Sequence, residues 1–189
     1  DDRGINWADG ESTQGIPGLG STKSDAINAI RRDADYAFSK INLFAARLQS
    51  LGGDFSLLVS LQGQWTNDRL PSSERAALGG EVILRAFDAG DLIGDRVGAG
   101  KLELRYEPAL IPGGRITFYA FAEEGYTTSI EVSPIPNQDT KGGTTGLGVR
   151  GSLANGLNFY AEAAKPHQRD PSSTGDRKTR FFAGLSYLF

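Results

Sequence analysis

Alternation between apolar and polar residues recurs along most of the chain and limits the folds it can adopt. In KLELRY (101–106) three charged residues alternate with three apolar ones. The same period of two runs through FSLLVSLQGQW (55–65), RITFYAFAEEG (115–125), GLGVRGSL (146–153), LNFYAEAA (157–164) and RFFAGLSYLF (180–189). Because successive side chains of a strand point to opposite faces, this period predicts half-buried β-strands. FSKINLFAARLQSL (38–51) is expected to be another strand, although its two faces are less cleanly separated.

The connections between these segments alternate in length. GGD (52–54), IPGG (111–114) and ANG (154–156) are tight turns, whereas 1–35, 67–97, 127–143 and 166–178 are long and polar; 24–34 suits a short helix. Short turns at one end of a meander and long loops at the other are typical of a bacterial outer-membrane barrel. Strands of about ten residues also match a tilted span of the hydrocarbon layer. A soluble antiparallel barrel or sandwich, with strands of about five or six residues, is the less favoured alternative.

The number of strands argues against a closed barrel made from this chain alone. Seven segments are clear strands, and RGIN near the start looks like the tail of an eighth, but DDRGINWADG (1–10) is too polar to supply a full strand. An open sheet edge is not tolerated in lipid. We therefore expect an all-β, antiparallel transmembrane β-barrel of which residues 1–189 form the C-terminal part, with seven to eight strands. The absence of an initial Met and of a basic-then-apolar leader indicates a removed signal peptide or a missing N-terminal part.

Composition and motifs give no sign of an enzyme. The chain has no Cys, a single His and a formal net charge of −3, so thiolate metal sites and disulfides are excluded and nucleic-acid binding is not indicated. His167 lies in the polar stretch AKPHQRDPSS, where a solvated side chain is expected, and no nucleophile has a base at a defensible spacing. GLGVRG lies within a strand pattern and leads into no helix, so it is no dinucleotide site. We expect no catalytic activity, no cofactor and no metal.

The loop at 67–97 is unusually apolar for an extracellular loop. Surface loops are normally polar, but this one contains Leu78, Val82, Ile83, Leu84, Phe87, Leu92 and Ile93. We therefore expect it to fold inward and plug the lumen. One more short strand at 73–84 is the alternative interpretation.

The same loop carries a family resemblance. LGGEVILRAFDAGDLIGDR, followed by KLELRY, resembles the sixth extracellular loop and the next strand of two-partner secretion outer-membrane transporters, the haemolysin activation/secretion type. That family has Val-Arg-Gly-Phe or Val-Arg-Gly-Tyr after a Gly pair, then an acidic, Gly-rich segment that ends in Gly-Asp-Arg-Gly, and a Phe-x-Asp-x-Gly motif in a later strand. The matching residues are Gly79, Gly80, Arg85, Phe87, Gly94, Asp95 and Arg96 in the loop, and Phe121, Glu123 and Gly125 in the strand. The resemblance extends from about residue 36 to Phe189.

Three positions depart from the family pattern. Leu84 replaces Val, Ala86 replaces Gly and Glu123 replaces Asp. A Cβ at 86 is costly if the family's Gly adopts a positive φ or lets the loop approach the wall closely. The longer Glu123 preserves an ion pair but changes its geometry. These departures suggest a divergent member of the family.

The resemblance implies that Arg85 at the loop tip pairs with Glu123 on the barrel wall. The alternation independently places Glu123 on the polar, lumen-facing side of its strand, together with Arg115, Tyr119 and Phe121. Leu185, Tyr187 and Phe189 at the end of the chain resemble the signal by which the barrel-assembly machinery recognises outer-membrane barrels.

By resemblance, the chain is the C-terminal half of a 16-stranded barrel in the bacterial outer membrane, without the N-terminal half and the periplasmic domains. Its implied function is the export of a large secreted exoprotein, of haemolysin or adhesin type, through the pore. The other partners implied are outer-membrane lipid and the assembly machinery, and no nucleic acid. The barrel of a patatin-type lipase or surface-antigen relative and a passive porin are the alternative interpretations.

Overall fold

The computed structural model describes residues 3–18, 31–154 and 156–188. Most of them form one antiparallel sheet in the order β1-β2-β3-β6-β7-β8-β9-β10. Its strands are β1 (Gly4–Gln14), β2 (Ser39–Gly52), β3 (Phe55–Thr66), β6 (Arg96–Tyr106), β7 (Arg115–Ser129), β8 (Gln138–Ser152), β9 (Leu157–His167) and β10 (Arg180–Tyr187). A short 3-10 helix, η1 (Ser72–Glu74), and a two-stranded hairpin of β4 (Ala76–Leu78) and β5 (Leu92–Gly94) lie between β3 and β6.

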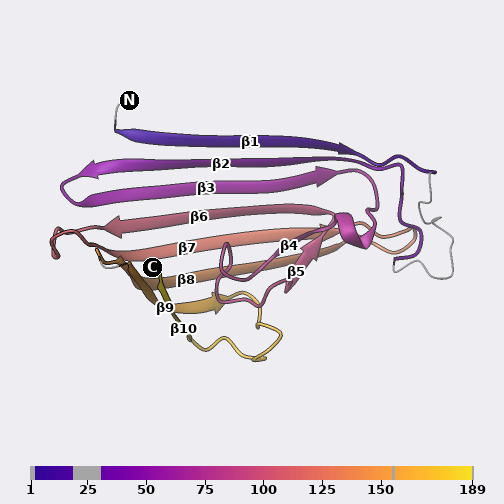
Figure 1. Ribbon diagram of the computed structural model, residues 1–189. Helices are drawn as coiled ribbons and strands as arrows, with labels where there is room; N and C mark the ends of the chain where they lie inside the picture. Colours follow the sequence, from indigo (N-terminus) through magenta and orange to yellow (C-terminus); the bar gives the residue numbers. More distant parts are fainter. Residues whose placement is uncertain (1–2, 19–30, 155, 189) are drawn as a thin grey trace.

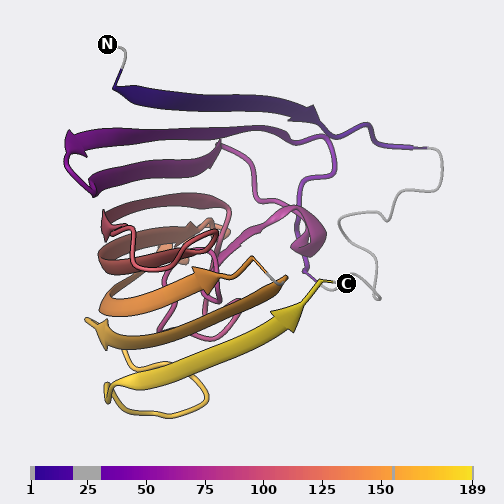
Figure 2. The ribbon, with the colours of Figure 1, turned by 60° about the vertical axis from the view of Figure 1, so that its left-hand side comes forward.

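The large sheet is curved, and the β4–β5 hairpin lies on its concave side (Figures 1 and 2). Each strand pairs with its sequence neighbour in the sheet, as an up-and-down meander does. β1 and β10 form the two edges, and neither has a second partner among the described residues. No helix in this part of the chain is long and apolar enough to cross a membrane.

Over β6 to β9 the two faces of the sheet have opposite chemistry. Large apolar side chains cover the convex face and are exposed, among them Leu61 (60%), Leu147 (65%) and Phe181 (79%). The concave face carries buried polar and aromatic residues: Glu103, Thr117, Tyr119, Phe121, Glu123, Thr144 and Glu162. An apolar exterior around a polar interior is the arrangement of a wall that faces lipid outside and a lumen inside. The face assignments for 101–106 and 115–125 are confirmed.

The prediction that residues 1–10 are too polar to supply a strand is wrong. β1 pairs with β2 over its whole length, from Gly4 opposite Gln49 to Gln14 opposite Ser39. Main-chain hydrogen bonds form this ladder whatever the side chains are, and Ile5 and Trp7 still provide an apolar stretch on one face. A polar edge strand therefore forms without a strong apolar pattern.

Two further boundaries differ from the prediction. β7 continues to Ser129 and β8 begins at Gln138, so the loop expected at 127–143 is reduced to 130–137. Thr127 and Thr140 pair in this extension, and β-branched residues suit a strand even where neither face is apolar. The short helix expected at 24–34 falls mostly outside the described residues, and 31–33 form a bend and turn.

Candidate functional site

Two glycines shape the hairpin that lies on the concave face. Gly79 and Gly80 follow β4 directly and have φ values of 113° and 93°, a region that side chains disfavour. A Cβ at Gly79 would lie 2.1 Å from the carbonyl oxygen of Asp88. The N–H of Gly80 donates to the Phe87 carbonyl at 3.0 Å, and the N–H of Phe87 donates to the Leu84 carbonyl at 2.8 Å. The glycine pair therefore lets the loop close on itself and present residues 84–87 to the wall.

Two glycines on the wall leave space for the apolar side chains of the hairpin. Gly125 on β7 and Gly142 on β8 are direct partners in the sheet. A Cβ at Gly125 would lie 2.7 Å from a methyl carbon of Leu78 and 2.7 Å from one of Leu84, and a Cβ at Gly142 would lie 3.1 Å from the Phe87 ring. The buried cluster above these glycines consists of Leu78, Ile83, Leu84, Phe87, Leu92, Val97 and Ala99. The expected extra strand at 73–84 is present only as β4, within this hairpin.

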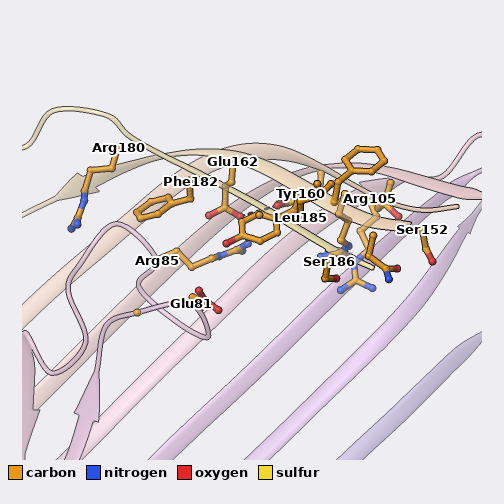
Figure 3. Close-up of a pocket in the computed structure, with 18 of the residues that line it drawn as sticks. Glu81, Arg85, Arg105, Ser152, Tyr160, Glu162, Arg180, Phe182, Leu185 and Ser186 are labelled. Carbon is orange, nitrogen blue, oxygen red and sulfur yellow. Dashed lines mark hydrogen bonds and ion pairs between the residues drawn. The ribbon is translucent and has the colours of Figure 1, made fainter. Parts of the chain in front are cut away.

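Arg85 reaches from the loop tip to three carboxylates on three wall strands; Figure 3 shows its side chain pointing toward one of them, Glu162. Its Nε donates to Glu123 Oε1 at 2.8 Å, and its backbone N–H donates to Glu123 Oε2 at 2.9 Å. Its Nη1 donates to Glu162 Oε2 at 2.6 Å and its Nη2 to Glu103 Oε2 at 3.1 Å. The pair of Arg85 and Glu123 is therefore formed, and charge-assisted bonds of this kind are strong and directional.

The three carboxylates have further cationic and hydroxyl partners. Glu103 Oε1 accepts from Arg105 Nε at 2.8 Å and from Arg150 Nη2 at 3.0 Å. Glu162 accepts from the Tyr119 hydroxyl at 2.9 Å. Within this cluster three arginines face three glutamates. Because all of them are partly or fully buried, these direct pairs of opposite charge offset part of the cost of desolvation.

Aromatic rings form the surface on which Arg85 rests. Its guanidinium carbon lies 3.5 Å from the centroid of the Phe121 ring, a cation–π geometry. Gly146 and Gly148 on β8 stand opposite Phe121 and Tyr119 in the sheet. A Cβ at Gly146 would lie 2.4 Å from the Phe121 ring, so the glycine lets this ring lie flat across the neighbouring strand. The wall therefore leaves room for the Phe121 ring in the orientation that contacts Arg85.

Asp95 ties the base of the hairpin to neighbouring loops at the same end of the sheet. This carboxylate is fully buried and accepts from the N–H of Leu70 at 3.0 Å, from the N–H of Ile130 at 2.6 Å and from Arg31 Nη2 at 2.8 Å. Burial raises the pKa of Asp95, but the hydrogen bonds from Arg31, Ile130 and Leu70 outweigh it and hold the pKa below its ordinary value. Asp95 thus joins the segments before β2, before β4 and after β7.

Arg96 has a separate structural role at the start of β6. Its Nε donates to the Thr66 carbonyl at 2.6 Å, and its guanidinium carbon lies 4.3 Å from the Trp65 ring centroid. Gly94 packs tightly, because a Cβ there would lie 2.8 Å from the Thr127 side chain. The structure therefore brings Arg85, Phe121, Glu123 and Gly125 together, and it places Gly94, Asp95 and Arg96 at the base of the same hairpin.

A second contact holds the loop tip from the side of the last strand. Arg180 on β10 donates to the Ala86 carbonyl at 2.9 Å and to Asp88 Oδ1 at 2.9 Å. The N–H of Ser173 also donates to Asp88, at 2.9 Å. Hydrogen bonds from Ser173 and Arg180 lower the pKa of Asp88. A cavity of about 850 Å³ lies beneath the tip, and its lining includes Arg85, Tyr119, Arg150, Glu162, Phe182 and Ser186 (Figure 3).

The departures from the family pattern have structural consequences. Ala86 is not among the described residues with positive φ; it is fully buried and packs against Tyr119, Phe121 and Ala164. Its Cβ is therefore accommodated. The left-handed residue is Leu84, with φ 57°, and this conformation costs a side-chain-bearing residue about 1–2 kcal/mol.

The C-terminal residues singled out by the sequence lie on the convex face. Leu185 and Tyr187 are exposed there, in line with Phe181. Phe189 lies outside the described residues. Their role as an insertion signal stays a prediction.

Sequence reasoning missed Glu103 and Glu162 as partners of Arg85. Both lie on the polar faces that alternation predicts, but they stand 18 and 77 residues from Arg85. No local spacing links such positions, so only the strand register could have brought them together. Among the described residues no group of acidic, His or Cys side chains is arranged to hold a metal ion.

Comparison with known proteins gave two matches. A family model described as "Haemolysin secretion/activation protein ShlB/FhaC/HecB" matches residues 2–150. The solved structure of CdiB from Escherichia coli is similar with a TM-score of 0.73 and 21% sequence identity over 98% of this chain. The chain spans about a third of that structure, covering 34% of its length. No curated protein sequence matches. At this identity the likeness to CdiB shows the fold alone.

Proposed function

This chain belongs to the haemolysin secretion/activation family ShlB/FhaC/HecB, whose place is the outer membrane of Gram-negative bacteria, and we propose that it forms part of a pore that exports a large partner protein. The partner is an exoprotein of haemolysin or adhesin type. The chain supplies the C-terminal half of a 16-stranded barrel. In support, the sheet has two edges without a second partner among the described residues, and the chain covers 34% of the CdiB chain.

The β4–β5 hairpin is the gate of this pore. The single observation that carries this proposal is the docking of Arg85 on the concave face, where its side chain forms ion pairs with Glu103, Glu123 and Glu162. Phe121 contacts Arg85 as well, and Gly125 and Gly142 leave room for the apolar side chains of the hairpin. A passive porin has no need of an apolar loop docked at an arginine-specific site.

The ion pairs between Arg85 and the wall glutamates are compatible with reversible docking of the hairpin. Each ion pair loses much of its Coulomb energy to desolvation, and all of the groups regain water when the hairpin leaves. The charges therefore orient the tip more than they stabilise it. The export of an unfolded chain requires only that the hairpin moves aside, and no nucleotide takes part.

The test uses the full-length protein together with its exoprotein. Arg85→Ala and Glu123→Ala are expected to lower secretion and to lengthen the open time of the channel in planar bilayers. Folding is checked by heat-modifiable gel mobility. Arg115→Ala is the matched control, because Arg115 faces the lumen on β7 and forms no ion pair with any described residue. Normal secretion and unchanged open time in both variants would refute the gate. A folded wild type that exports nothing would favour a porin or a lipase-linked barrel.

A further inference from the structure

Lys101 stands directly opposite Glu123 in the sheet, on the neighbouring strand β6. Both side chains belong to the concave face, and opposed side chains of an antiparallel pair have Cβ atoms about 4.5–5.5 Å apart. The ammonium group of Lys101 nevertheless forms no ion pair with any residue that the structure describes, whereas Arg85, Arg105 and Arg150 all do. The charges of Arg85, Glu103 and Glu123 all act on it. Lys101 is therefore the one cation of this cluster without a direct partner in the described chain.

Arg85, and not Lys101, is the cation that pairs directly with Glu123 in this structure. Both carboxylate oxygens of Glu123 are occupied by Arg85, one by the backbone N–H at 2.9 Å and the other by Nε at 2.8 Å. Lys101 borders instead a cavity of about 380 Å³, which it shares with Val82 and Ile83 of the hairpin. Withdrawal of the hairpin would remove both the competing cation and the side chains beside Lys101.

The charged side chains around Arg85 also indicate a role for Lys101 when the hairpin leaves. The wall residues immediately around Arg85 include three carboxylates, Glu103, Glu123 and Glu162, and three cations, Lys101, Arg105 and Arg150. With the hairpin seated, Arg85 is a fourth cation against three carboxylates. With the hairpin withdrawn, three cations face three carboxylates. Lys101 therefore supplies one of the three cations that remain beside these glutamates when Arg85 leaves.

Resting on the proposed gate, we infer that Lys101 is the replacement counter-ion of Glu123, which pairs with it when Arg85 leaves and thereby sets how readily the hairpin is released. Lys101 opposes the closed state, because it faces Arg85 with the same charge. It stabilises the open state, because it neutralises the Glu123 carboxylate after Arg85 has left. Lys101 is a positioning residue of the wall and has no contact with the exported chain in this argument.

The experiment records the open time of the full-length protein in planar bilayers. Lys101→Gln is expected to shorten the open time at least roughly fivefold, the lower end of the usual coupling between two sites. Lys101→Arg is expected to restore it, because it keeps the charge. Arg115→Gln is the matched control, since it removes a lumen-facing cation at the far end of β7 from Glu123. Lys101→Met, which keeps the aliphatic stem, replaces Lys101→Gln if that variant does not fold.

Two further variants separate this inference from the gate itself. Arg85→Ala must lengthen the open time if the hairpin is the gate, and Lys101→Gln must have no further effect once Glu123 is changed to Gln. If Arg85→Ala lengthens the open time but Lys101→Gln and Lys101→Met leave it at the wild-type value, the replacement role of Lys101 is refuted and the gate stands. If Arg85→Ala has no effect, the gate is refuted and the inference with it. An equal effect of Lys101→Gln with and without the Glu123 carboxylate also refutes the inference.

Discussion

Gly125→Ala tests whether the hairpin rests on the wall as the structure places it. The new methyl carbon would lie 2.7 Å from Leu78 Cδ1 and 2.7 Å from Leu84 Cδ1. Carbon atoms in contact are normally about 3.5–4.0 Å apart, so both leucines, which are buried, must move. Gly125 does not have a positive φ, and alanine fits its backbone. The whole effect therefore comes from the contact with the hairpin.

Overpacking of a buried site costs about 1–3 kcal/mol. If this cost falls on the seated hairpin and not on the barrel, the fraction of released hairpin rises about 5- to 150-fold. Gly98→Ala is the matched control on the adjacent strand β6, because a Cβ there meets no atom within 4 Å. Both variants share the loss of glycine freedom in the unfolded chain, so their difference isolates the contact.

The assay uses a single cysteine in place of Ala86, in a full-length protein with no other cysteine; the chain itself has none. Ala86 belongs to the loop tip and is fully buried against the wall, so a maleimide reagent reaches position 86 only when the hairpin is released. When opening is fast, the labelling rate follows the open population. Gly125→Ala should label much faster than Gly98→Ala. Equal rates in the two variants mean that the hairpin does not rest on Gly125, and the reasoning fails.

Three more predictions are tested by limited proteolysis or by the same labelling. Asp95→Asn leaves Arg31 without its buried partner, a loss of about 3–5 kcal/mol, and should speed proteolysis of the loops that Asp95 joins; a cleavage rate equal to wild type contradicts this. In the wild type the folded-state pKa of Asp95 is lowered. The stability that the Asp95 carboxylate adds is therefore complete above its ordinary pKa of about 3.9 and decreases as the pH falls through the lowered value. If the loops lose their resistance to proteolysis already at about pH 6, Asp95 is not the group that holds them. Phe121→Leu removes the ring beneath Arg85 and should raise labelling at position 86 about 5- to 30-fold, for a loss of one to two kcal/mol, whereas Phe118→Leu on the convex face should not.

The strands and their faces were predictable because one face of each meets an apolar surrounding along most of its length. KLELRY encodes both the strand and its orientation without any knowledge of its neighbours. β1 was missed for the complementary reason. It forms an edge whose stability comes from main-chain pairing with β2, and Asp9, Gly10 and Glu11 leave little trace of alternation. The polar extensions of β7 and β8 were missed in the same way.

The site was predictable only as far as the family resemblance and the strand faces reached. The resemblance pointed to Arg85 and Glu123, and alternation placed Glu123 in the lumen. The other two glutamates depend on register: Glu103 lies opposite Phe121, and Glu162 reaches Tyr119 through Gly148. Such rows across four strands follow from how the turns set each pairing, and single-strand patterns carry no information about them.

The apolar contacts and the ion pairs between the hairpin and the wall contribute differently to docking, so variants of each should have different effects. Burial of Leu78, Leu84, Phe87 and Leu92 contributes about 1.5–3 kcal/mol for each side chain, and lumen water cannot replace it. The ion pairs of Arg85 exchange protein partners for water at little net gain. The apolar cluster therefore supplies most of the affinity of the hairpin for the wall, and Arg85 supplies its position. It follows that Arg85→Ala alone should leave the hairpin loosely docked, with a partial rise in labelling at position 86, and that only its combination with Gly125→Ala should approach the rate of a fully released loop.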